Sequence, residues 1–502
     1  MAQKTQKKAR NAARSRPARR PAKKPSRKPA RQPAAAPPQP QPQAPAPRIV
    51  DKALLQHAAI EHVWPNFASR PDLARKEPKF IVSGEGAVVR DAEGREYIDA
   101  FAGILTTQCG YGRVEIADAV HEQMKRMAFY PNLIDFFSET VARLGERLSH
   151  LVPAGLDRFI FSCDGSEAVE VALKVAQRYQ QTQGFPRRYK VIARRQSYHG
   201  VTLGALSLNG TTAFRQPFEP LLPGVRHAPA AHCYRCELGL AYPACELRCA
   251  KEVETIIRWE SPDTVSAMIL EPVMGVRTGF AVPPREYLPE IRRICDRYGV
   301  LLIHDEVLTG FGRTGKTFAC EHWNVTPDLM AMAKGLTSGY LPLGATAVKQ
   351  VIAQKFIGEA AEHDFIHGHT FGGHPASCAA AIANLDLFDK EGLTDRAHRL
   401  GFYLREKLNE LRKHPTVGDV RGIGMLFAIE FVKDKKTKEK FPPELGLMRR
   451  FRLRCWESGL IVRNEADLIA LAPPLVLTRE QADKIVAILE KVITELEQKW
   501  IK

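Results

Sequence analysis

The chain has 502 residues, of which 44% are hydrophobic, so it is long enough for more than one domain and can bury a large core. Its apolar runs are too short to span a membrane, which argues against an integral membrane protein. The formal charge of +17 lies mainly in residues 1–48, which hold fourteen of the 73 bases and no acid; the other 59 bases face 56 acids, a net charge of about +3.

Residues 1–48 form a basic, Pro/Ala-rich extension that offers almost no apolar residues for burial. The segment is therefore expected to be disordered, with a polyproline-type spacer in its second half. The leading interpretation is a solvated extension without a function of its own. Nonspecific binding of nucleic acid or another polyanion comes second. A transit peptide comes third, because an amphipathic helix needs apolar residues that this segment lacks.

A strand, a glycine turn and a helix are predicted in succession near residue 160. The strand spans 158–162, the turn contains Asp164 and Gly165, and the helix begins at Ser166. Gly165 allows a ligand to approach the backbone closely, and the amide groups of the first helical turn can receive a phosphate. Many α/β proteins contain such turns, so this motif alone is weak evidence for a phosphate site.

Six of the ten cysteines are scattered, as thiols in a reducing compartment would be. The other four form two close pairs in the segment HCYRCELGLAYPACELRC: Cys233 with Cys236, and Cys245 with Cys249. A knuckle of this length could fold around one zinc ion, although the spacing of the second pair is less typical of zinc sites. A redox-sensitive disulfide and plain structural thiols are the alternatives, and no metal site is assigned from the sequence.

Two charged residues follow apolar runs in the middle of the chain. Asp305 ends the run VLLIH, where a buried parallel strand would deliver a carboxylate to the rim of an α/β sheet. Lys334 lies among small and apolar residues, and an amine kept away from water becomes nucleophilic. The pair indicates pyridoxal phosphate chemistry, in which a lysine binds the cofactor and an acid protonates its ring. Taken singly, a turn-capping aspartate and a surface lysine are the alternatives.

A nucleotide-phosphate loop is also suggested by spacing, because Gly310, Gly315, Lys316 and Thr317 satisfy GxxxxGK[ST]. Such a loop needs a helix that opens at the lysine. The residues that follow, FACEHWNVTPDL, contain a proline and scattered aromatics and have no helical period. An ATPase or kinase is therefore not favoured.

Near the C-terminus, the sequence FYLREKLNELRKH predicts a helix, MLFAIEFVKD a strand, and EQADKIVAILEKVITELEQKW a closing helix. Two further short strands are predicted at 459–461 and 472–477, both returning towards the residues around Lys334. No internal repeat is evident.

From about residue 63 to 499 the chain resembles the class III, or omega, aminotransferases of the type I pyridoxal-phosphate fold. The resemblance rests on several motifs in fixed order: AGILTTQCGYGR, CDGSEAVEVALKVA, SYHG, LEPVMG, HDEV, AKG and HTFGGHP. It implies an α/β fold with a mostly parallel sheet in a large cofactor domain, and a smaller α+β domain built from the N- and C-terminal parts. We expect the small domain to take residues 49–100 and 374–502, and the large domain residues 101–373.

The resemblance implies pyridoxal 5'-phosphate as the cofactor and a role for each matching residue. Lys334 would bind it covalently and, once displaced by the incoming amine, would move the proton between substrate carbon and cofactor. Asp305 would pair with the pyridinium nitrogen. Asp164 departs from the small hydroxyl residue common in the family, and its carboxylate would repel a phosphate if it pointed inward. The other implied cofactor contacts are Gly165 and Ser166 at the phosphate, Tyr198 and Val307 on the two ring faces, His199 without an acid–base role, Glu271, and Thr370, which would reach the phosphate of the partner subunit.

Three positions separate the chain from the glutamate-using ornithine and acetylornithine aminotransferases. That branch typically has glutamine, glutamate and arginine where this chain has Leu308, Val276 and Ala470. Arg463 instead matches the mobile arginine of the amine:pyruvate branch, which can pair with a keto-acid carboxylate and swing out for an uncharged amine. A surface arginine is the alternative.

Three further residues match positions that line the amine pocket of that branch: Leu105, Phe129 and Tyr130. Leu105 replaces a tryptophan found in some relatives, which leaves room for a larger or aliphatic amine. The donor itself is not specified by the sequence.

The resemblance therefore predicts a cytoplasmic transaminase with a ping-pong mechanism. It would move an amino group from a primary amine or omega-amino acid to a keto acid, with pyruvate favoured. A homodimer with shared active sites is expected, with a tetramer left open. A racemase or phospho-lyase with the same cofactor is one alternative, and a regulatory protein that binds nucleic acid through the basic extension is another.

Overall fold

The computed structural model describes residues 51–67, 78–358 and 363–501, and the chain from Val50 to Lys502 forms one unit. The predicted extension of residues 1–48 lies outside the described residues, so its disorder stays a prediction. Among the described helices, none combines the length and the apolar composition that a membrane crossing requires.

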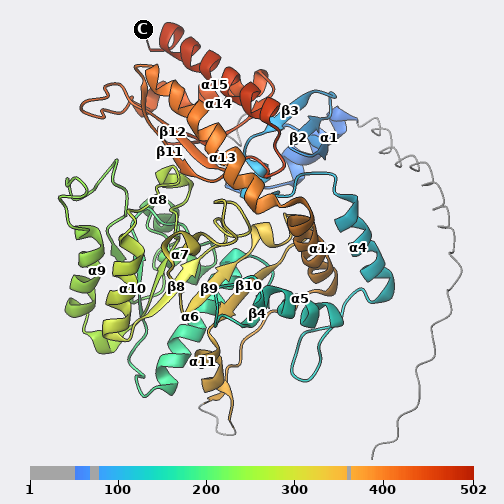
Figure 1. Cartoon of the computed structure of the whole chain (residues 1–502). Coiled ribbons are helices and arrows are strands. Elements are labelled where there is room, and N and C mark those ends of the chain that lie inside the picture. Colours follow the sequence, from blue (N-terminus) through green and yellow to red (C-terminus); the bar gives the residue numbers. More distant parts are fainter. Residues whose placement is uncertain (1–50, 68–77, 359–362, 502) are drawn as a thin grey trace, which may run out of the picture. The chain divides into compact units, whose positions relative to one another are not determined.

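A seven-stranded sheet, in the order β4-β10-β9-β8-β7-β5-β6, occupies the centre of the larger part of the structure (Figure 1). β10 runs antiparallel to both of its neighbours, and the other pairs are parallel. β7, β8, β9 and β10 are buried along their whole length, which explains their uninterrupted apolar sequences. The strands are β4 (Arg158–Ser162), β5 (Lys190–Arg194), β6 (Val225–Ala228), β7 (Val265–Leu270), β8 (Leu301–Asp305), β9 (Leu329–Met332) and β10 (Gly344–Val348).

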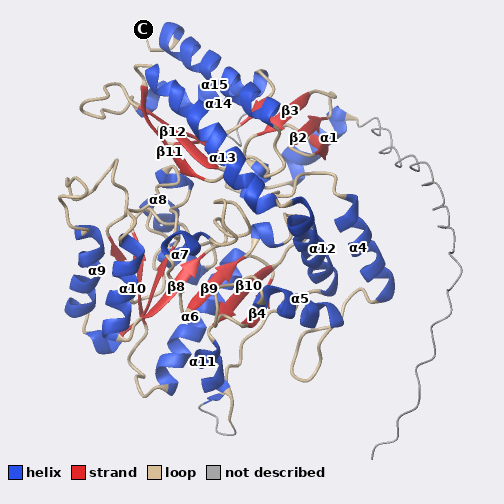
Figure 2. Ribbon diagram, viewed as in Figure 1, coloured by secondary structure: helices blue, strands red, loops and turns tan. Residues whose placement is uncertain are grey.

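Helices cover both faces of this sheet, because successive residues of a strand point to opposite faces. In β7, Ala267 and Ile269 pack in one core cluster with α6, whereas Met268 and Leu270 pack in another with α9 and α10. α12 packs against both α4 and α5, and α5 also contacts β4 (Figure 2). The helices of this part are α4 (Val114–Arg126), α5 (Glu139–Ser149), α6 (Gly165–Thr182), α7 (Leu203–Leu208), α8 (Thr212–Arg215), α9 (Arg248–Trp259), α10 (Tyr287–Tyr298), α11 (Gln350–Ala353) and α12 (Pro375–Glu391).

Two four-stranded sheets complete the fold, in the orders β1-β2-β3-β13 and β11-β12-β15-β14. β13 pairs parallel to β3, so the N-terminal and C-terminal parts of the chain share one sheet, as the resemblance implied (Figure 1). The strands are β1 (Ile81–Glu85), β2 (Val88–Asp91), β3 (Glu96–Asp99), β11 (Val417–Ile423), β12 (Leu426–Phe431), β13 (Leu460–Ile461), β14 (Arg463–Glu465) and β15 (Leu468–Leu471). The remaining helices are α1 (Lys52–His62), α3 (Ala102–Leu105), α13 (Leu393–Asn409), α14 (Leu447–Glu457) and α15 (Arg479–Lys499).

The C-terminal predictions are confirmed with one exception. α13, β12, β13 and α15 lie where they were expected, but the strand predicted at 472–477 is wrong. β15 ends at Leu471, and the residues that follow form a loop and a turn. Pro473 and Pro474 lack the backbone N–H that a strand needs, so the apolar character of this stretch serves core packing rather than a sheet.

The predicted site residues follow strands that point in one direction. β5, β8 and β9 are parallel, and β4 is parallel to β9 because both pair antiparallel with β10. The segments after β4, β5, β8 and β9 therefore emerge at the same edge of the sheet, which is where ligands bind in open α/β folds.

Candidate active site

Lys334 begins a tight turn directly after β9. Its φ angle is 42°, in the left-handed region that residues other than glycine rarely adopt. The turn is held in place by Asn384 of α12, whose Nδ2 donates to the carbonyl oxygens of Gly335 (2.9 Å) and Leu336 (3.0 Å). Strained backbone of this kind persists only where the surrounding structure requires it, and it is common at active sites. Asn384 was not identified from the sequence, because it lies 49 positions from Gly335 in an ordinary helical pattern.

Burial lowers the pKa of the Lys334 ammonium below its usual range, and the Asp305 carboxylate opposes this shift. The two residues found by sequence pattern therefore lie close enough to interact. A lowered pKa increases the fraction of neutral amine at a given pH, and the neutral amine is the nucleophilic form.

Asp305 is 5% exposed and is fixed through both carboxylate oxygens. Nδ1 of His199 donates to Oδ2 at 2.8 Å, and the backbone N–H of Val307 donates to Oδ1 at 3.1 Å. The backbone N–H of His199 donates in turn to Oδ1 of Asn209 at 2.6 Å, which holds the loop after β5 in place. His199 therefore positions the carboxylate, a role that the sequence did not reveal.

The turn between β4 and α6 is closely packed. An added Cβ on Gly165 would lie 2.7 Å from Cγ1 of Val307, and one on Gly200 would lie 2.6 Å from Oγ of Ser166. Neither position tolerates a side chain without movement of its neighbour. The motifs CDGS, SYHG and DEV, which are far apart in sequence, thus meet around this turn.

Asp164 caps the N-terminus of α6. Its Oδ1 accepts from the backbone N–H of Glu167 at 2.9 Å, and Oε2 of Glu167 accepts from the backbone N–H of Cys163 at 2.7 Å. The two carboxylates thereby satisfy two backbone donors reciprocally. Asp164 is solvent-exposed, so water screens its charge.

Tyr198 and Val307 both lie beside Asp305. Burial raises the pKa of Tyr198, and the nearby carboxylates of Asp305 and Asp164 add to this shift. The ring of Tyr198 packs edge-on against Phe214, with centroids 5.8 Å apart.

Glu271 is 4% exposed, and both of its carboxylate oxygens contact other groups of the protein. Oε1 accepts from the backbone N–H groups of Tyr198 (3.2 Å) and Gly275 (3.3 Å), while Oε2 lies 3.2 Å from Nη2 of the buried Arg194. These contacts of Glu271 fix the position of the loop that carries Tyr198.

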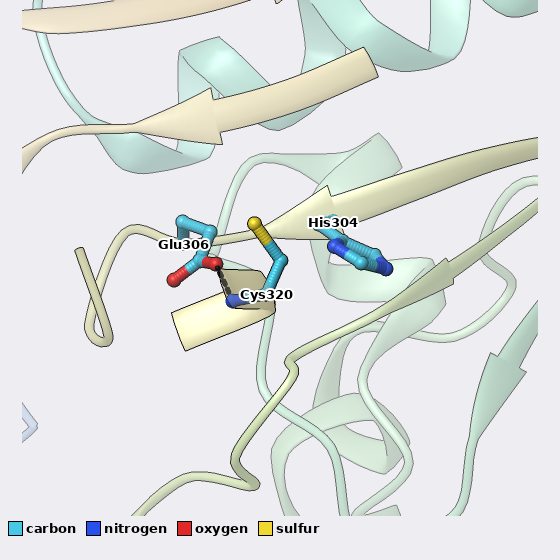
Figure 3. Close-up of side chains that lie close together, drawn as sticks. All are labelled: His304, Glu306 and Cys320. Carbon is cyan, nitrogen blue, oxygen red and sulfur yellow. Dashed lines mark hydrogen bonds between the residues drawn. The ribbon is translucent and has the colours of Figure 1, made fainter. Parts of the chain in front are cut away.

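Three buried side chains lie close together near Asp305 (Figure 3). His304 and Glu306 are its two neighbours in sequence, and Cys320 belongs to the turn at 319–320. Possible metal-ligating atoms of this group lie within 4.8 Å of one another. The Glu306 carboxylate, however, already accepts from the backbone N–H groups of Ala319 (3.0 Å) and Cys320 (2.8 Å) and from the hydroxyl of Thr309. This carboxylate therefore anchors the turn beneath Asp305.

Of the five residues predicted for the substrate or the partner subunit, Phe129 packs edge-on against Phe371, with ring centroids 5.6 Å apart. The other four differ in their exposure. Leu105 is 3% exposed and packs in the core, whereas Tyr130 is 41% exposed and rests edge-on against Phe136. Arg463 and Thr370 are exposed. Within the described residues, none of these four side chains hydrogen-bonds or ion-pairs with Lys334 or Asp305.

The segments that carry Leu105 and Arg463 nevertheless run side by side. The backbone N–H of Ala100 donates to the carbonyl of Ile461 at 3.0 Å, and that of Ala472 donates to the carbonyl of Ala100 at 2.7 Å. These bonds place the start of α3 between β13 and the end of β15.

Comparisons with known proteins agree with this geometry. The model of the family described as aminotransferase class-III matches residues 73–493. A probable aminotransferase of Mycobacterium tuberculosis is 40% identical over 454 residues, which cover 89% of this chain and 96% of the relative. The putrescine–pyruvate aminotransferase of Pseudomonas aeruginosa is 34% identical over 441 residues, with 88% and 96% covered.

Among solved structures, an (S)-enantioselective omega-transaminase from Thermomicrobium roseum superimposes with a TM-score of 0.85 at 40% identity, covering 88% of this chain and 98% of that one. Related enzymes of similar identity are named for different substrate pairs. The comparisons therefore establish the reaction class but not the substrate, which depends on the residues of the pocket.

Proposed function

This chain belongs to the class III aminotransferases, a pyridoxal-phosphate-dependent family, and from that premise we propose that it moves an amino group from a primary amine or omega-amino acid to pyruvate. The single observation that carries the donor–acceptor part of the proposal is the position of Arg463 opposite Ala470. A ping-pong mechanism follows from one pocket that receives the donor and the acceptor in turn.

The residues at the sheet edge fit pyridoxal phosphate. The packed turn at Gly165 and the first amides of α6 suit a phosphate, and Lys334 and Asp305 suit the carbonyl and the ring nitrogen. His199 Nε2 is buried and has no hydrogen-bond partner among the described residues. A buried polar atom at this end of the site therefore still needs a partner. The bound cofactor would supply a carbonyl that reacts with amines and a ring that accepts the electron pair released at the substrate carbon.

Lys334 would hold and move the proton. Burial lowers the pKa of its amine and so favours the neutral form, which can take a proton from the substrate carbon and return one to the neighbouring position. Asp305 would hold the proton on the ring nitrogen, and His199 keeps the carboxylate aimed in that direction. The ring of Tyr198 and the side chain of Val307 would fix the ring plane from its two faces.

Arg463 would bind the carboxylate of the keto acid. In the antiparallel pair of β14 and β15, Arg463 lies directly opposite Ala470, the position at which the glutamate-using branch has its arginine. Directly opposed residues share one face of a sheet, with Cβ atoms about 5 Å apart. A guanidinium that starts from position 463 can therefore reach much of the space that an arginine at 470 would serve.

Among the described residues Arg463 has no ion-pair partner, whereas its neighbour Glu465 pairs with Arg277. This freedom supports a side chain that swings towards a carboxylate and away from an uncharged amine. Leu308 and Val276 are partly buried and pack with the core on the α9–α10 face, so they add no charge that would favour a second carboxylate. A monocarboxylate acceptor such as pyruvate therefore suits the site better than 2-oxoglutarate.

The proposal includes a homodimer in the cytoplasm. Large exposed apolar side chains cluster in two stretches of the described chain: Leu133, Ile134, Phe136, Phe137, Ile366 and Phe371. Exposed apolar patches of this kind are typical of interfaces. Thr370 lies in the second stretch, which supports its predicted reach to the phosphate of the partner subunit.

A half-reaction screen tests the substrate assignment. Purified enzyme is mixed with single amines or omega-amino acids, and the absorbance of the cofactor's carbonyl form is followed before and after addition of a keto acid. Rapid recovery with pyruvate and slow recovery with 2-oxoglutarate is the expected result. A preference for 2-oxoglutarate would contradict the role given to Arg463.

A further inference from the structure

The four clustered cysteines have no part in the chemistry described above, yet the fold brings them to one place. Cys233, Cys236, Cys245 and Cys249 all line a single cavity of about 20 Å³ between the end of β6 and the start of α9. A volume of this size fits one water-sized object. Residues separated by up to sixteen positions thus converge on a space for one small ion.

The segment that carries them is held by turns and side-chain contacts and not by regular secondary structure. Residues 229–247 contain no helix or strand, and irregular segments of this length are usually functional or held by a specific device. The backbone N–H of Gly239 donates to the carbonyl of Cys236 at 3.1 Å, and that of Arg248 donates to the carbonyl of Cys245 at 3.0 Å. Each cysteine pair is therefore associated with its own tight turn.

The second turn contains two successive residues in the left-handed region, Glu246 at φ 46° and Leu247 at φ 55°. Neither is glycine, so this backbone is strained. The strained turn brings Cys249, in the first turn of α9, back towards Cys245. The N-terminus of α9 has no side-chain cap, and the positive end of its helix dipole favours a negative sulfur nearby.

Polar neighbours of the cavity are engaged elsewhere. Arg248 bonds to Glu252 at 2.7 Å, and Nδ1 of His232 accepts from the backbone N–H of Arg235 at 3.3 Å. Burial raises the pKa of Cys249 to about 11, and the other three thiols, which line the same cavity, add to this shift.

The segment with the four cysteines, the knuckle of residues 233–249, also contacts the C-terminal part of the chain. Arg235, between the first two cysteines, donates from Nε to Oε1 of Glu430 at 2.6 Å. Glu430 lies on β12 and is 3% exposed, so its carboxylate depends on this contact and on that with Arg421. Fixing the backbone on both sides of Arg235 would therefore stabilise the contact between the knuckle and the C-terminal part of the chain.

We propose that Cys233, Cys236, Cys245 and Cys249 form a tetrahedral four-thiolate site for one Zn²⁺ ion. Binding releases the four thiol protons and leaves each sulfur as a thiolate on the metal. In a tetrahedral site with Zn–S bonds of about 2.3 Å, the sulfurs lie about 3.8 Å apart. Among the described residues, no three of these sulfurs lie within 4.8 Å of one another, so binding requires their side chains to rotate into the cavity.

Metal analysis of the full chain tests this site. The protein is produced with zinc supplied and without a metal-binding tag, and its zinc, iron and phosphorus contents are measured. About one zinc per chain is expected for the parent, and less than about 0.1 for Cys236→Ser/Cys249→Ser. Cys163→Ser, a partly buried cysteine outside the cluster, and Arg235→Ala are matched controls that should both retain zinc. A parent without zinc, iron in its place, or zinc retained by the double variant would overturn the proposal.

A second measurement does not depend on the folding of a cysteine variant. Zinc in the parent is exchanged for Co²⁺, and the visible and near-ultraviolet spectrum is recorded. Four thiolates give intense sulfur-to-cobalt charge transfer and the strong visible bands of a tetrahedral ion. Alkylation should modify all four cysteines only after a chelator has removed the metal. Weak octahedral bands, or disulfides between these cysteines in the freshly purified chain, would exclude the site.

Discussion

Nδ1 of His199 lies 2.8 Å from Oδ2 of Asp305, and the two residues are 3% and 5% exposed. A buried carboxylate that accepts a hydrogen bond from an imidazole and another from a backbone amide has a fixed direction. The proton that Asp305 would hold on the cofactor nitrogen would therefore depend on His199, to which no acid–base role is assigned.

His199→Leu should lower kcat while the cofactor remains bound. A hydrogen bond to a charged group contributes about 1.5–3 kcal/mol, so a loss of roughly 10- to 150-fold is expected. His199→Asn keeps an N–H near the position of Nδ1 and should lose much less. Steady-state kinetics are combined with a pH titration of the cofactor absorbance, which should shift in the leucine variant alone. Equal kcat values for the leucine variant and the parent would show that His199 is only a packing residue.

The coupling between Lys334 and Asp305 predicts a pH effect in the cofactor-free enzyme. The Asp305 carboxylate stabilises the ammonium form of Lys334 and raises its pKa, while burial lowers it. Asp305→Asn removes only the raising contribution, so the neutral amine should appear at lower pH than in the parent. Reductive methylation of Lys334, followed by peptide mass spectrometry across a pH series, measures this.

The labelling profile of the exposed Lys316 should be the same in both proteins and serves as the internal control. A Lys334 profile that moves to higher pH in Asp305→Asn, or does not move, would contradict the proximity of the two groups.

Gly165→Ala should weaken cofactor binding. The added Cβ would lie 2.7 Å from Cγ1 of Val307, and relieving such overpacking costs about 1–3 kcal/mol, or roughly 5- to 150-fold in the dissociation constant. The double variant Gly165→Ala/Val307→Ala removes the clashing methyl groups and should recover part of the loss. Equilibrium titration of the cofactor-free proteins with pyridoxal phosphate provides the constants, and unchanged binding in Gly165→Ala would argue against this turn as the phosphate site.

Arg463→Ala should raise the KM for pyruvate and for donors that carry a carboxylate. A bidentate, charge-assisted pair in a partly desolvated pocket contributes about 2–4 kcal/mol, so kcat/KM for the keto acid should fall by roughly 30- to 1000-fold. An uncharged amine should be affected far less in the isolated first half-reaction.

Because positions 463 and 470 face each other across β14 and β15, Arg463→Ala/Ala470→Arg should regain part of the carboxylate binding. Equal losses for charged and uncharged donors in the single variant would mean that Arg463 supports the fold instead.

Local patterns predicted the strands and the helix that carry the candidate site residues. The apolar run that ends at Asp305 is β8, and the strand and helix around Gly165 are β4 and α6, with the helix starting one residue earlier than expected. These features depend on short stretches of sequence, such as an apolar run or a capping residue. The strand predicted at 472–477 failed for an equally local reason, since two prolines end the strand pattern.

Contacts between distant segments could not be predicted in this way. His199 and Asp305 are 106 positions apart, and Asn384 and Gly335 are 49 apart, so neither contact has a local signature. The register that sets Arg463 opposite Ala470 likewise depends on the pairing of two strands and not on either strand alone. The domain boundaries at residues 100 and 373 and the partner contact of Thr370 stay predictions.

The central claim is an amino-group transfer at Lys334 with pyruvate as acceptor, and a two-step half-reaction tests it most directly. Cofactor-loaded enzyme is mixed with a primary amine or omega-amino acid, separated from excess donor, and then mixed with pyruvate. The absorbance of the carbonyl form should disappear in the first step and return in the second, with one alanine formed per active site. If no donor in a broad panel removes the absorbance, or if pyruvate does not restore it, the proposed transamination is contradicted.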